Sequence, residues 1–350
     1  MKTVNLINAR VFDGEAVHEN ARVRIEDGRV LELAENGLGM AEASVSIDLE
    51  GRLLAPGLID IQVNGGGGVL FNDAPTVETI RTIGAAHRRF GTTGFLPTLI
   101  SSTASTTADA IRAVRQAIEE KVPGVLGIHL EGPFLAAAKR GIHDASHFRT
   151  IDEDGFKRVT SLGVGRTLLT VAPEMTGPDW IQRLTNAGII VFAGHSNAEY
   201  EQVREALDAG LRGFTHLFNA MSPFESRSPG MVGTALSDRE SYAGLICDGY
   251  HVHPASFAAA VAAKGSTHCL LVTDAMATVG SETGDFEWNG ETVLARGGCC
   301  RLPDGSLAGS DLDMMTAVRN AMRYGGMNLS LIHISEPTRQ VLVSRMPSSA

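Results

Sequence analysis

The pattern of apolar and polar residues changes near Pro56-Gly57. Before this point, short alternating runs are separated by the pairs Asp13-Gly14, Asp27-Gly28 and Glu50-Gly51. Asp-Gly between two alternating runs is typical of a tight β-hairpin. Residues 1–55 are therefore predicted to form the N-terminal part of a small antiparallel β module, with a loop at residues 35–44.

After Pro56-Gly57, short apolar runs alternate with longer stretches whose apolar residues recur every three or four positions, as in amphipathic helices. The apolar runs are predicted to be strands at residues 58–63, 94–99, 125–130, 167–172, 189–193, 212–217, 243–248 and 269–273. Eight successive strand–helix units favour an α/β fold, a TIM-like (β/α)8 barrel over residues 56–328. In such a barrel the chemistry lies on loops at the C-terminal ends of the strands.

Residues 275–309 interrupt this rhythm, and the pairs Asn289-Gly290 and Asp304-Gly305 predict two β-hairpins there, packed over or beside the barrel rim. From Leu329 the chain loses helical and strand periodicity. Residues 329–350 are atypical of a protein terminus, and we interpret them as non-native sequence that is left out of the fold prediction.

Metal-ligating residue types gather where the predicted strands end. Glu131 ends the third strand, His195 and His216 follow the fifth and sixth, and Asp274 follows the eighth. A catalytic zinc site usually has three protein ligands and one open position, which Glu131, His195 and His216 fit. Asp274 is then expected to be the base rather than a ligand. Each residue alone is often a hydrogen-bonded structural group, but four at one rim predict a metal centre.

Two other histidines are expected to have structural roles. His129 should point away from Glu131 if the strand alternates, which favours a buried, hydrogen-bonded position. His253 precedes Pro254 and is interpreted as a helix-entry residue.

Composition excludes several functional classes. The net charge is −10 over 350 residues, which disfavours binding to nucleic acid or acidic membrane surfaces. The first 15 residues lack the apolar core of a signal peptide, and no apolar run approaches the ~18 residues of a membrane span. Four cysteines, two of them adjacent at Cys299 and Cys300, form neither a disulfide framework nor a spaced zinc motif. A cytoplasmic protein with reduced thiols is expected.

Several motifs in chain order carry a family resemblance: APGLIDIQVNG, HLEGPF, KRGIH, GHSNA, THLFNAMSP, DGYHVHP, LVTDAM and LAGS. Over about residues 1 to 328, the chain resembles the N-acetylglucosamine-6-phosphate deacetylases of the amidohydrolase superfamily. The resemblance implies hydrolysis of the acetamide of N-acetyl-D-glucosamine 6-phosphate to D-glucosamine 6-phosphate and acetate, a step of amino sugar metabolism.

The resemblance also implies roles for individual residues. Glu131, His195 and His216 match the family's metal ligands, Asp274 its catalytic acid and base, and His143 the residue that polarises the acetyl carbonyl. The positions that match substrate-binding groups are Ile142, His143, Asn219, Ala220, Arg227 and His251, with Leu307-Ala308-Gly309 as the loop that closes on the substrate.

The implied cofactor is one divalent metal ion per subunit. Zinc is expected, while iron, cobalt and manganese suit the same ligands. Many amidohydrolases hold a second metal with a His-x-His pair on the first strand, and we align that place with Asp60-Ile61-Gln62. A single tightly held metal is therefore predicted, with Gln62 left as a contact for a weak second ion or a water. The family also implies a homodimer.

Two alternative functions stay open. One is another amidohydrolase activity, such as that of a deaminase or a cyclic amidase. The other is a non-catalytic protein that binds a sugar phosphate. In the family the C-terminal segment completes the small β-sandwich-like module, so this module is predicted to be incomplete at the C-terminus, with an unpaired edge and reduced stability.

Overall fold

The structure, a computed structural model, describes residues 3–35, 41–282 and 284–327. The chain divides into two compact units, one that includes Met1–Gly57 and one that consists of Leu58–Met327. The atypical tail predicted for residues 329–350 lies outside the described residues, and so does the segment on which the predicted incompleteness of the small β module depends.

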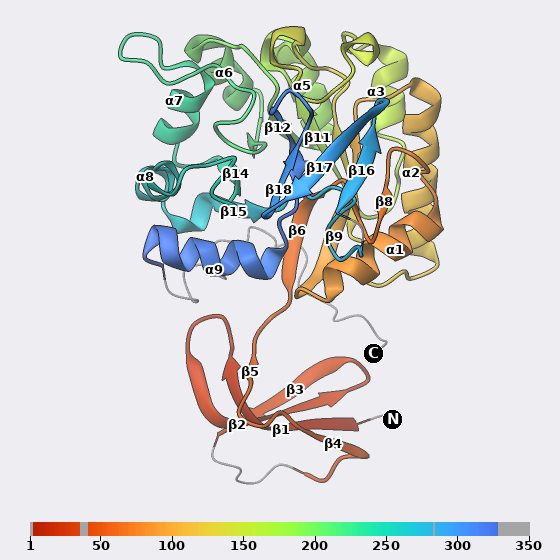
Figure 1. Ribbon diagram of the computed structural model, residues 1–350, viewed down its shortest axis with the longest axis vertical. Helices are drawn as coiled ribbons and strands as arrows, with labels where there is room; N and C mark the ends of the chain where they lie inside the picture. Colours follow the sequence, from red (N-terminus) through yellow and green to blue (C-terminus); the bar gives the residue numbers. More distant parts are fainter. Residues whose placement is uncertain (1–2, 36–40, 283, 328–350) are drawn as a thin grey trace. The chain divides into compact units, whose positions relative to one another are not determined.

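The first unit contains one five-stranded sheet with the order β3-β2-β1-β4, in which β5 also pairs with β1 (Figure 1). Its strands are β1 (Thr3–Phe12), β2 (Val17–Glu26), β3 (Arg29–Ala34), β4 (Val45–Asp48) and β5 (Leu53–Leu54). The pair Asp27-Gly28 joins β2 to β3 in the predicted hairpin, and both residues have positive φ. Alternating residues of β1 and β2 form a small apolar core: Ala9, Val11, Ala21 and Val23.

The second unit is built on an eight-stranded parallel sheet with the order β15-β14-β13-β12-β11-β10-β9-β6. Its strands are β6 (Leu58–Val63), β9 (Thr92–Ile100), β10 (Gly127–Glu131), β11 (Arg166–Val171), β12 (Ile190–Ala193), β13 (Gly213–Phe214), β14 (Tyr242–Ile246) and β15 (Cys269–Val272). All eight predicted strands are present, with ends that differ by a few residues. The sixth is shortened because the chain leaves the sheet before His216, whose φ is 35°.

The first and last strands of this sheet meet and close it into a barrel. The backbone N–H of Asp274 donates to the carbonyl oxygen of Gln62 at 2.9 Å, and Val63 forms a parallel bridge with Ala275. Below this contact, the hydroxyl of Thr273 donates to the buried carboxylate of Asp60 at 2.5 Å. The expected TIM-like barrel is confirmed.

Helices cover the outside of the barrel (Figure 1). They are α1 (Val77–Arg88), α2 (Ala104–Glu119), α3 (Glu153–Val159), α4 (Pro173–Thr176), α5 (Pro178–Asn186), α6 (Tyr200–Asp208), α7 (Gly230–Ser237), α8 (Pro254–Lys264) and α9 (Met314–Gly325). Side chains of Thr76, Thr103 and Asp313 cap the N-termini of α1, α2 and α9. Within the described residues, none of these helices combines the length and apolar composition needed to cross a bilayer.

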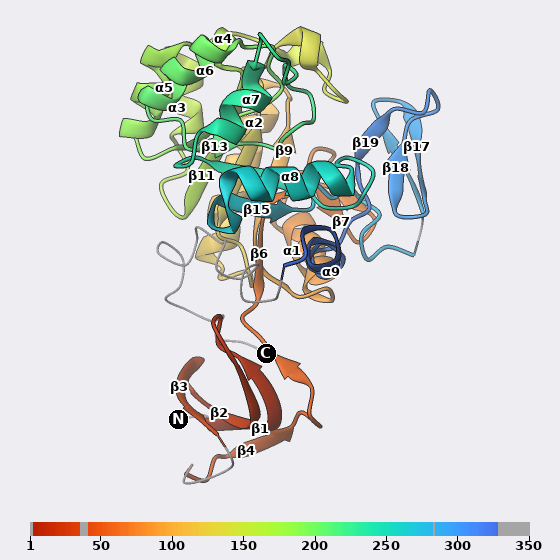
Figure 2. The ribbon, with the colours of Figure 1, turned by 90° about the vertical axis from the view of Figure 1, so that its left-hand side faces the viewer.

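The chain between β15 and α9 forms a separate antiparallel sheet, which stands beside the barrel in Figure 2. Its strands are β16 (Asp285–Trp288), β17 (Glu291–Arg296), β18 (Cys299–Arg301) and β19 (Leu307–Ser310). The predicted turns at Asn289-Gly290 and Asp304-Gly305 join the first and last pairs of strands. Buried side chains of the sheet, among them Trp288, Val293 and Ala308, pack on residues at the ends of barrel strands, including Ile100 of β9 and Met276, which follows β15. This sheet therefore rests on the rim where the predicted site lies.

Candidate active site and metal centre

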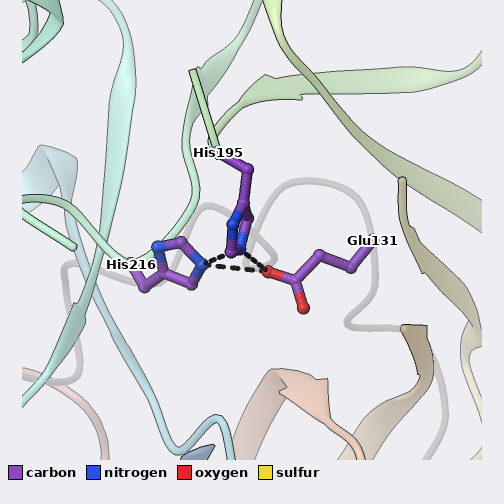
Figure 3. Close-up of side chains that lie close together, drawn as sticks. All are labelled: Glu131, His195 and His216. Atoms are coloured by element: carbon purple, nitrogen blue, oxygen red, sulfur yellow. Dashed lines mark hydrogen bonds and ion pairs between the residues drawn. The ribbon is translucent and has the colours of Figure 1, made fainter. Parts of the chain in front are cut away.

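Three buried side chains converge at the C-terminal end of the barrel strands (Figure 3). Glu131 is the last residue of β10, while His195 and His216 follow β12 and β13. The Oε1 atom of Glu131 lies 3.2 Å from Nε2 of His195 and 2.9 Å from Nε2 of His216, and the two Nε2 atoms are 3.0 Å apart. The structure thus brings together the three predicted metal ligands, and this group is a candidate metal site.

The backbone at the ends of these strands is unusual. His195, His216 and Asp274 have φ values of 49°, 35° and 52°, a region that residues other than glycine rarely adopt. Such strain persists only where neighbouring contacts impose it, and it is common at functional sites. Here the carbonyl of His195 accepts from Ala136 N–H, and the N–H of Leu217 donates to Gly244. The chain is held in a conformation that turns these side chains inward.

The tautomer of His195 suits a metal ligand. Its Nδ1 lies 2.8 Å from the carbonyl oxygen of Lys139, which can only accept, so the proton resides on Nδ1. The lone pair of a neutral ring is then on Nε2 and faces Glu131 and His216. Gly141 permits the loop to approach, because a Cβ there would lie 3.2 Å from Cε1 of His195. A backbone carbonyl as the partner of a ligating histidine is a common arrangement in metal sites.

The electrostatics also fit a cation. Burial alone would raise the pKa of Glu131, but the neighbouring imidazoles of His195 and His216 hold it well below its usual range. Burial opposes the charged form of His216, yet the Glu131 carboxylate raises the pKa of this imidazole. In a tetrahedral site with bonds of about 2.1 Å, ligand atoms are about 3.4 Å apart. The three observed separations are close to that value, so the carboxylate and two imidazoles fit a divalent ion.

Asp274 stands beside this cluster. Its Oδ1 accepts a hydrogen bond of 3.1 Å from Nε2 of Gln62 and one of 2.7 Å from Nδ2 of Asn64. The same Gln62 nitrogen donates to Glu131 Oε1 at 3.1 Å, so Gln62 bridges the two carboxylates. Burial and the nearby charge of Glu131 raise the pKa of Asp274 to about 6. A carboxyl group with a pKa in this range can both accept and return a proton near neutral pH.

The first strand corrects one alignment made from the sequence. Asp60, Gln62 and Asn64 are two residues apart and are all buried. Asp60 bonds to Thr273, whereas Gln62 and Asn64 both face Asp274. The pair directed at the site is therefore Gln62 and Asn64, and not Asp60 and Gln62 as the motif comparison assumed. Gln62 contacts its neighbours through its amide nitrogen, which donates and does not bind metal.

His143 lies against the same cluster. Its ring centroid is 4.4 Å from that of His195, and its Nε2 is 3.8 Å from Oε2 of Glu131. Burial and the neighbouring His195 hold the pKa of His143 well below its usual range, so the ring is neutral. The hydroxyl of Ser101, which follows β9, is 2.8 Å from Nδ1 of His143. The preceding residue, Ile142, accepts a hydrogen bond from the Trp288 indole at 3.0 Å.

Most other predicted substrate residues lie on neighbouring loops. Asn219 donates to the carbonyl of His216 at 3.2 Å, and the carbonyl of Ala220 accepts from Ser196, next to His195. The Nδ1 atom of His251 is 2.6 Å from the carboxylate of Asp248, so only Nε2 of His251 remains for another partner. A positive charge on His251 would lower the pKa of Asp274. Arg227 is exposed in the loop before α7.

Leu307, Ala308 and Gly309 belong to β19, which is tied to the strand end that carries Asp274. The N–H of Ser310 donates to the carbonyl of Asp274 at 3.0 Å, and the N–H of Met276 donates to Ser310 at 2.9 Å. Gly309 has a φ of 64°, and a Cβ there would lie 2.4 Å from Cγ of Met276. Glycine is thus required for this close approach.

The two histidines assigned structural roles have them. His129 is 1% exposed and its Nε2 lies 2.8 Å from the hydroxyl of Thr170. It is two residues before Glu131 in β10 and therefore shares a face with it, so the prediction that His129 points away from Glu131 is wrong. His253 caps the N-terminus of α8 by accepting from the N–H of Ala255. Neither histidine belongs to the ligand cluster.

For three residues of the site no role was predicted from the sequence. A role for Asn64 could have been predicted, because it is two positions after Gln62 and alternation places both on one face. Ser101 directly follows β9, but a serine there carries no chemical signal. Glu174 lies in α4, directly after β11, and its carboxylate accepts from the Ser196 hydroxyl and the Asn197 N–H, both at 2.6 Å. It therefore fixes the loop that follows His195.

Comparison with known proteins agrees with this geometry. The family model described as the amidohydrolase family matches residues 53–334. The N-acetylgalactosamine-6-phosphate deacetylase of Shewanella sp. (strain ANA-3) is 48% identical over 277 residues, which are 79% of this chain and 70% of that protein. The N-acetylglucosamine-6-phosphate deacetylase of Haemophilus influenzae is 34% identical over 322 residues, 91% of this chain and 84% of that protein.

Solved structures give the same result. The N-acetylglucosamine-6-phosphate deacetylase from Pasteurella multocida has a TM-score of 0.89 and 32% identity, and the match covers 94% of this chain and 86% of that one. The Thermotoga maritima enzyme of the same name has a TM-score of 0.84 and 26% identity, with coverage of 99% and 92%. With the family match spanning most of the chain and a buried Glu-His-His cluster at the rim of its barrel, this protein belongs to the amidohydrolase family.

Proposed function

We propose that this chain hydrolyses the acetamide of N-acetyl-D-glucosamine 6-phosphate, giving D-glucosamine 6-phosphate and acetate. The observation that carries the proposal is the buried cluster of Glu131, His195 and His216 with Asp274 held beside it by Gln62. These four residues would supply the metal ligands and the base that amide hydrolysis needs. The names of the relatives at 48% and 34% identity, both hexosamine-6-phosphate deacetylases, supply the substrate class.

The proton path is assigned to Asp274. As water adds to the acetyl carbon, Asp274 accepts one of its protons, and it later donates that proton to the departing amine. The C–N bond then breaks, and one molecule of water has been consumed to give an amine and acetate. Gln62 and Asn64 both bond to Oδ1 of Asp274, which orients the carboxylate through this exchange.

Glu131, His195 and His216 would hold one divalent cation, which we propose to be zinc. When bound, such an ion acts as a Lewis acid toward the acetyl carbonyl and lowers the pKa of water. His143 would donate a hydrogen bond to the acetyl oxygen as negative charge develops there. A donor in this position is worth about 3 kcal/mol of barrier in comparable hydrolases.

The sugar and its phosphate are assigned to the loops around this cluster. Arg227 and His251, with the backbone at Asn219-Ala220, would bind the phosphate and the sugar hydroxyls, since a guanidinium matches phosphate oxygens. Ile142 and the Leu307-Ala308-Gly309 segment would close on the substrate. We also propose, from the family resemblance, a homodimer located in the cytoplasm that binds neither nucleic acid nor membrane, in agreement with the net charge of −10.

A second candidate substrate is N-acetyl-D-galactosamine 6-phosphate. The observation in its favour is that the 48% identical Shewanella relative carries this name, whereas the 34% identical Haemophilus relative is named for the glucosamine compound. The two sugars differ only in the configuration at C4, and the acetamide chemistry is identical for both. The proposed mechanism is therefore the same for either substrate.

The test is acetate release by metal-analysed protein from both N-acetylhexosamine 6-phosphates and from unphosphorylated N-acetylglucosamine, with and without a chelator. We expect turnover of a phosphorylated sugar that the chelator abolishes and that added Zn²⁺ restores, with far poorer use of the unphosphorylated sugar. Arg227→Ala should raise KM for the phosphorylated sugar much more than for the unphosphorylated one. Tight binding without acetate release would instead indicate a sugar-phosphate binding protein, and turnover of cyclic amides or aminopurines alone would indicate another amidohydrolase.

A further inference from the structure

The environment of His143 contains a serine with no assigned role. Ser101 follows β9, is 7% exposed, and has its hydroxyl 2.8 Å from Nδ1 of His143. Its backbone N–H points at the same nitrogen, with Ser101 N 3.4 Å from Nδ1. Two groups of one residue therefore converge on a single ring nitrogen of His143.

The backbone contact decides the direction of these bonds. An amide N–H can only donate, so Nδ1 of His143 is an acceptor and carries a lone pair. The Ser101 hydroxyl has a second potential acceptor, the carbonyl oxygen of Glu131, at 3.3 Å. If the hydroxyl donated to that carbonyl, its oxygen would accept from Nδ1, and Nδ1 would have to carry a proton. That proton would face the N–H of Ser101, and two donors cannot form a hydrogen bond. The shorter contact, 2.8 Å to Nδ1, is therefore the one to which the hydroxyl donates.

A neutral imidazole with a lone pair on Nδ1 has its proton on Nε2. This nitrogen is directed toward the ligand cluster, 3.8 Å from Oε2 of Glu131, which is too far for a hydrogen bond. The Nε2 proton is thus presented beside the site of reaction. The opposite tautomer would present a lone pair there, which cannot stabilise a developing negative charge on oxygen.

Local packing makes space for the Ser101 hydroxyl and contacts the His143 ring. A Cβ at position 132 would lie 2.2 Å from the Ser101 hydroxyl, so Gly132 makes space for it next to Glu131. On its other edge, the His143 ring contacts Phe148 with centroids 6.1 Å apart. The ring is therefore fixed in place while Ser101 determines which nitrogen bears the proton.

From this geometry we propose that Ser101 is a positioning residue that holds His143 in the Nε2–H tautomer, so that His143 can donate to the acetyl oxygen. The proposal rests on the proposed deacetylase function for its kinetic consequence. The tautomer itself is a property of the protein and can be measured without substrate.

The kinetic test compares Ser101→Ala and Ser101→Thr with Ser102→Ala, a control at the next residue, whose hydroxyl is not among the groups bonded to His143. Loss of the hydroxyl is expected to lower kcat by about 10- to 100-fold with KM within about threefold. This is less than the loss of about 100- to 1,000-fold seen when an oxyanion donor itself is removed, because His143 stays in place. Ser101→Thr should keep kcat within about threefold, because it retains the hydroxyl. Metal content should equal that of the wild-type protein.

A second substrate separates this role from a general packing defect. An N-trifluoroacetyl analogue has a more electrophilic carbonyl and depends less on a hydrogen-bond donor, so the loss caused by Ser101→Ala should be at least about fivefold smaller with it. A Ser101→Ala enzyme that retains the wild-type kcat would overturn the proposal. So would an equal loss with both substrates.

The tautomer is read directly from ¹⁵N NMR of histidine-labelled, Zn²⁺-loaded protein, with the His143 signals identified from their loss in His143→Asn. We expect a pyridine-type Nδ1 and a pyrrole-type Nε2 in the wild-type protein, and an altered pattern in Ser101→Ala. A pyrrole-type Nδ1 in the wild-type protein would refute the proposal whether or not any variant folds. If the wild-type protein released no acetate from any substrate, the proposed function would fail, and this NMR result would still decide the role of Ser101.

Discussion

The side-chain amide of Asn64 donates a hydrogen bond of 2.7 Å to the Oδ1 atom of Asp274, although 210 residues separate them. Closure of the barrel produces this contact, because β6 and β15 are the first and last strands of the sheet and meet at its seam. Asp274, which we assign as acid and base, is therefore oriented by a residue that follows β6, the first strand of the barrel. The position of its carboxylate depends on the whole barrel being formed.

Asp274→Asn should keep the metal and lose the reaction. The change preserves shape but removes the group that takes up and returns the proton, and general acid–base groups contribute about 100- to 10,000-fold to rate. We expect kcat for acetate release to fall at least about 1,000-fold while metal content, measured by elemental analysis, stays near that of the wild-type protein. An active Asn variant would show that another group moves the proton.

Asn64→Leu should shift the pH dependence of the reaction. The hydrogen bond from Asn64 lowers the pKa of Asp274, against burial and the charge of Glu131, which raise it. Removing the donor makes the carboxylate harder to form, so the acid limb of kcat/KM should move to higher pH. A bond to a charged group contributes about 1.5 to 3 kcal/mol and one pH unit is about 1.4 kcal/mol, so a shift of about one to two units is expected.

Profiles of kcat/KM from pH 5 to 9 for the two proteins, at equal metal content, measure this shift. The direction is fixed by the chemistry, since losing a donor to a carboxylate cannot lower its pKa. An acid limb that moved to lower pH, or did not move, would mean that Asp274 is not the group that titrates in the reaction.

The barrel and its ligand triad could be predicted because both depend on simple rules. Apolar runs alternating with helical spacing specify the strands, and parallel strands place Glu131, His195 and His216 at one edge. The residues that contact and position the site residues could not be predicted from these rules. Ser101 contacts His143 at 2.8 Å and Glu174 contacts Ser196 at 2.6 Å. These contacts depend on the conformation of the loops, which the periodicity of apolar residues does not specify.

The first strand, β6, also shows what periodicity does not predict. Its alternation correctly places Asp60, Gln62 and Asn64 on one face, but the depth of each residue in the barrel follows from the register with β15. Asp60 is the deepest, where burial raises its pKa to about 7 and Thr273 bonds to it. The motif comparison placed the His-x-His position two residues too early. It therefore assigned to the site the buried structural carboxyl of Asp60 in place of Asn64, which faces the site.

Glu131→Gln should empty the metal site. Glu131 is the acidic member of the three-ligand cluster, and without its charge the Nε2 atoms of His195 and His216 are 3.0 Å apart with no carboxylate between them. We expect metal content after dialysis to fall below about one tenth of the wild-type value and acetate release to be lost with it. Glu153→Gln, an exposed control on α3, should retain both. Full metal occupancy in Glu131→Gln would contradict the assignment.

Glu174→Gln should weaken metal binding without abolishing it. The Glu174 carboxylate holds Ser196 and Asn197 in the loop directly after His195, where the backbone is strained. Groups that orient a metal ligand typically contribute about 10- to 100-fold to metal affinity. Competition with a metal-binding dye should show a loss in that range, and excess Zn²⁺ should restore most of kcat. An unchanged affinity would mean that the loop keeps its shape without Glu174.

Lys264→Met should reduce stability and leave catalysis intact. Lys264 is 3% exposed on α8, and its ammonium donates to the carbonyls of Ala235 and Asp238 at 2.8 and 2.7 Å, which closes the C-terminal end of α7. Methionine has a similar length but no donor, so these carbonyls would be left buried without it. The free energy of unfolding should fall by about 2 to 3 kcal/mol, measured by urea denaturation. Lys157→Met, at an exposed position of α3, should change it by less than about 0.5 kcal/mol. Equal unfolding midpoints for the two variants would show that water replaces the ammonium without loss.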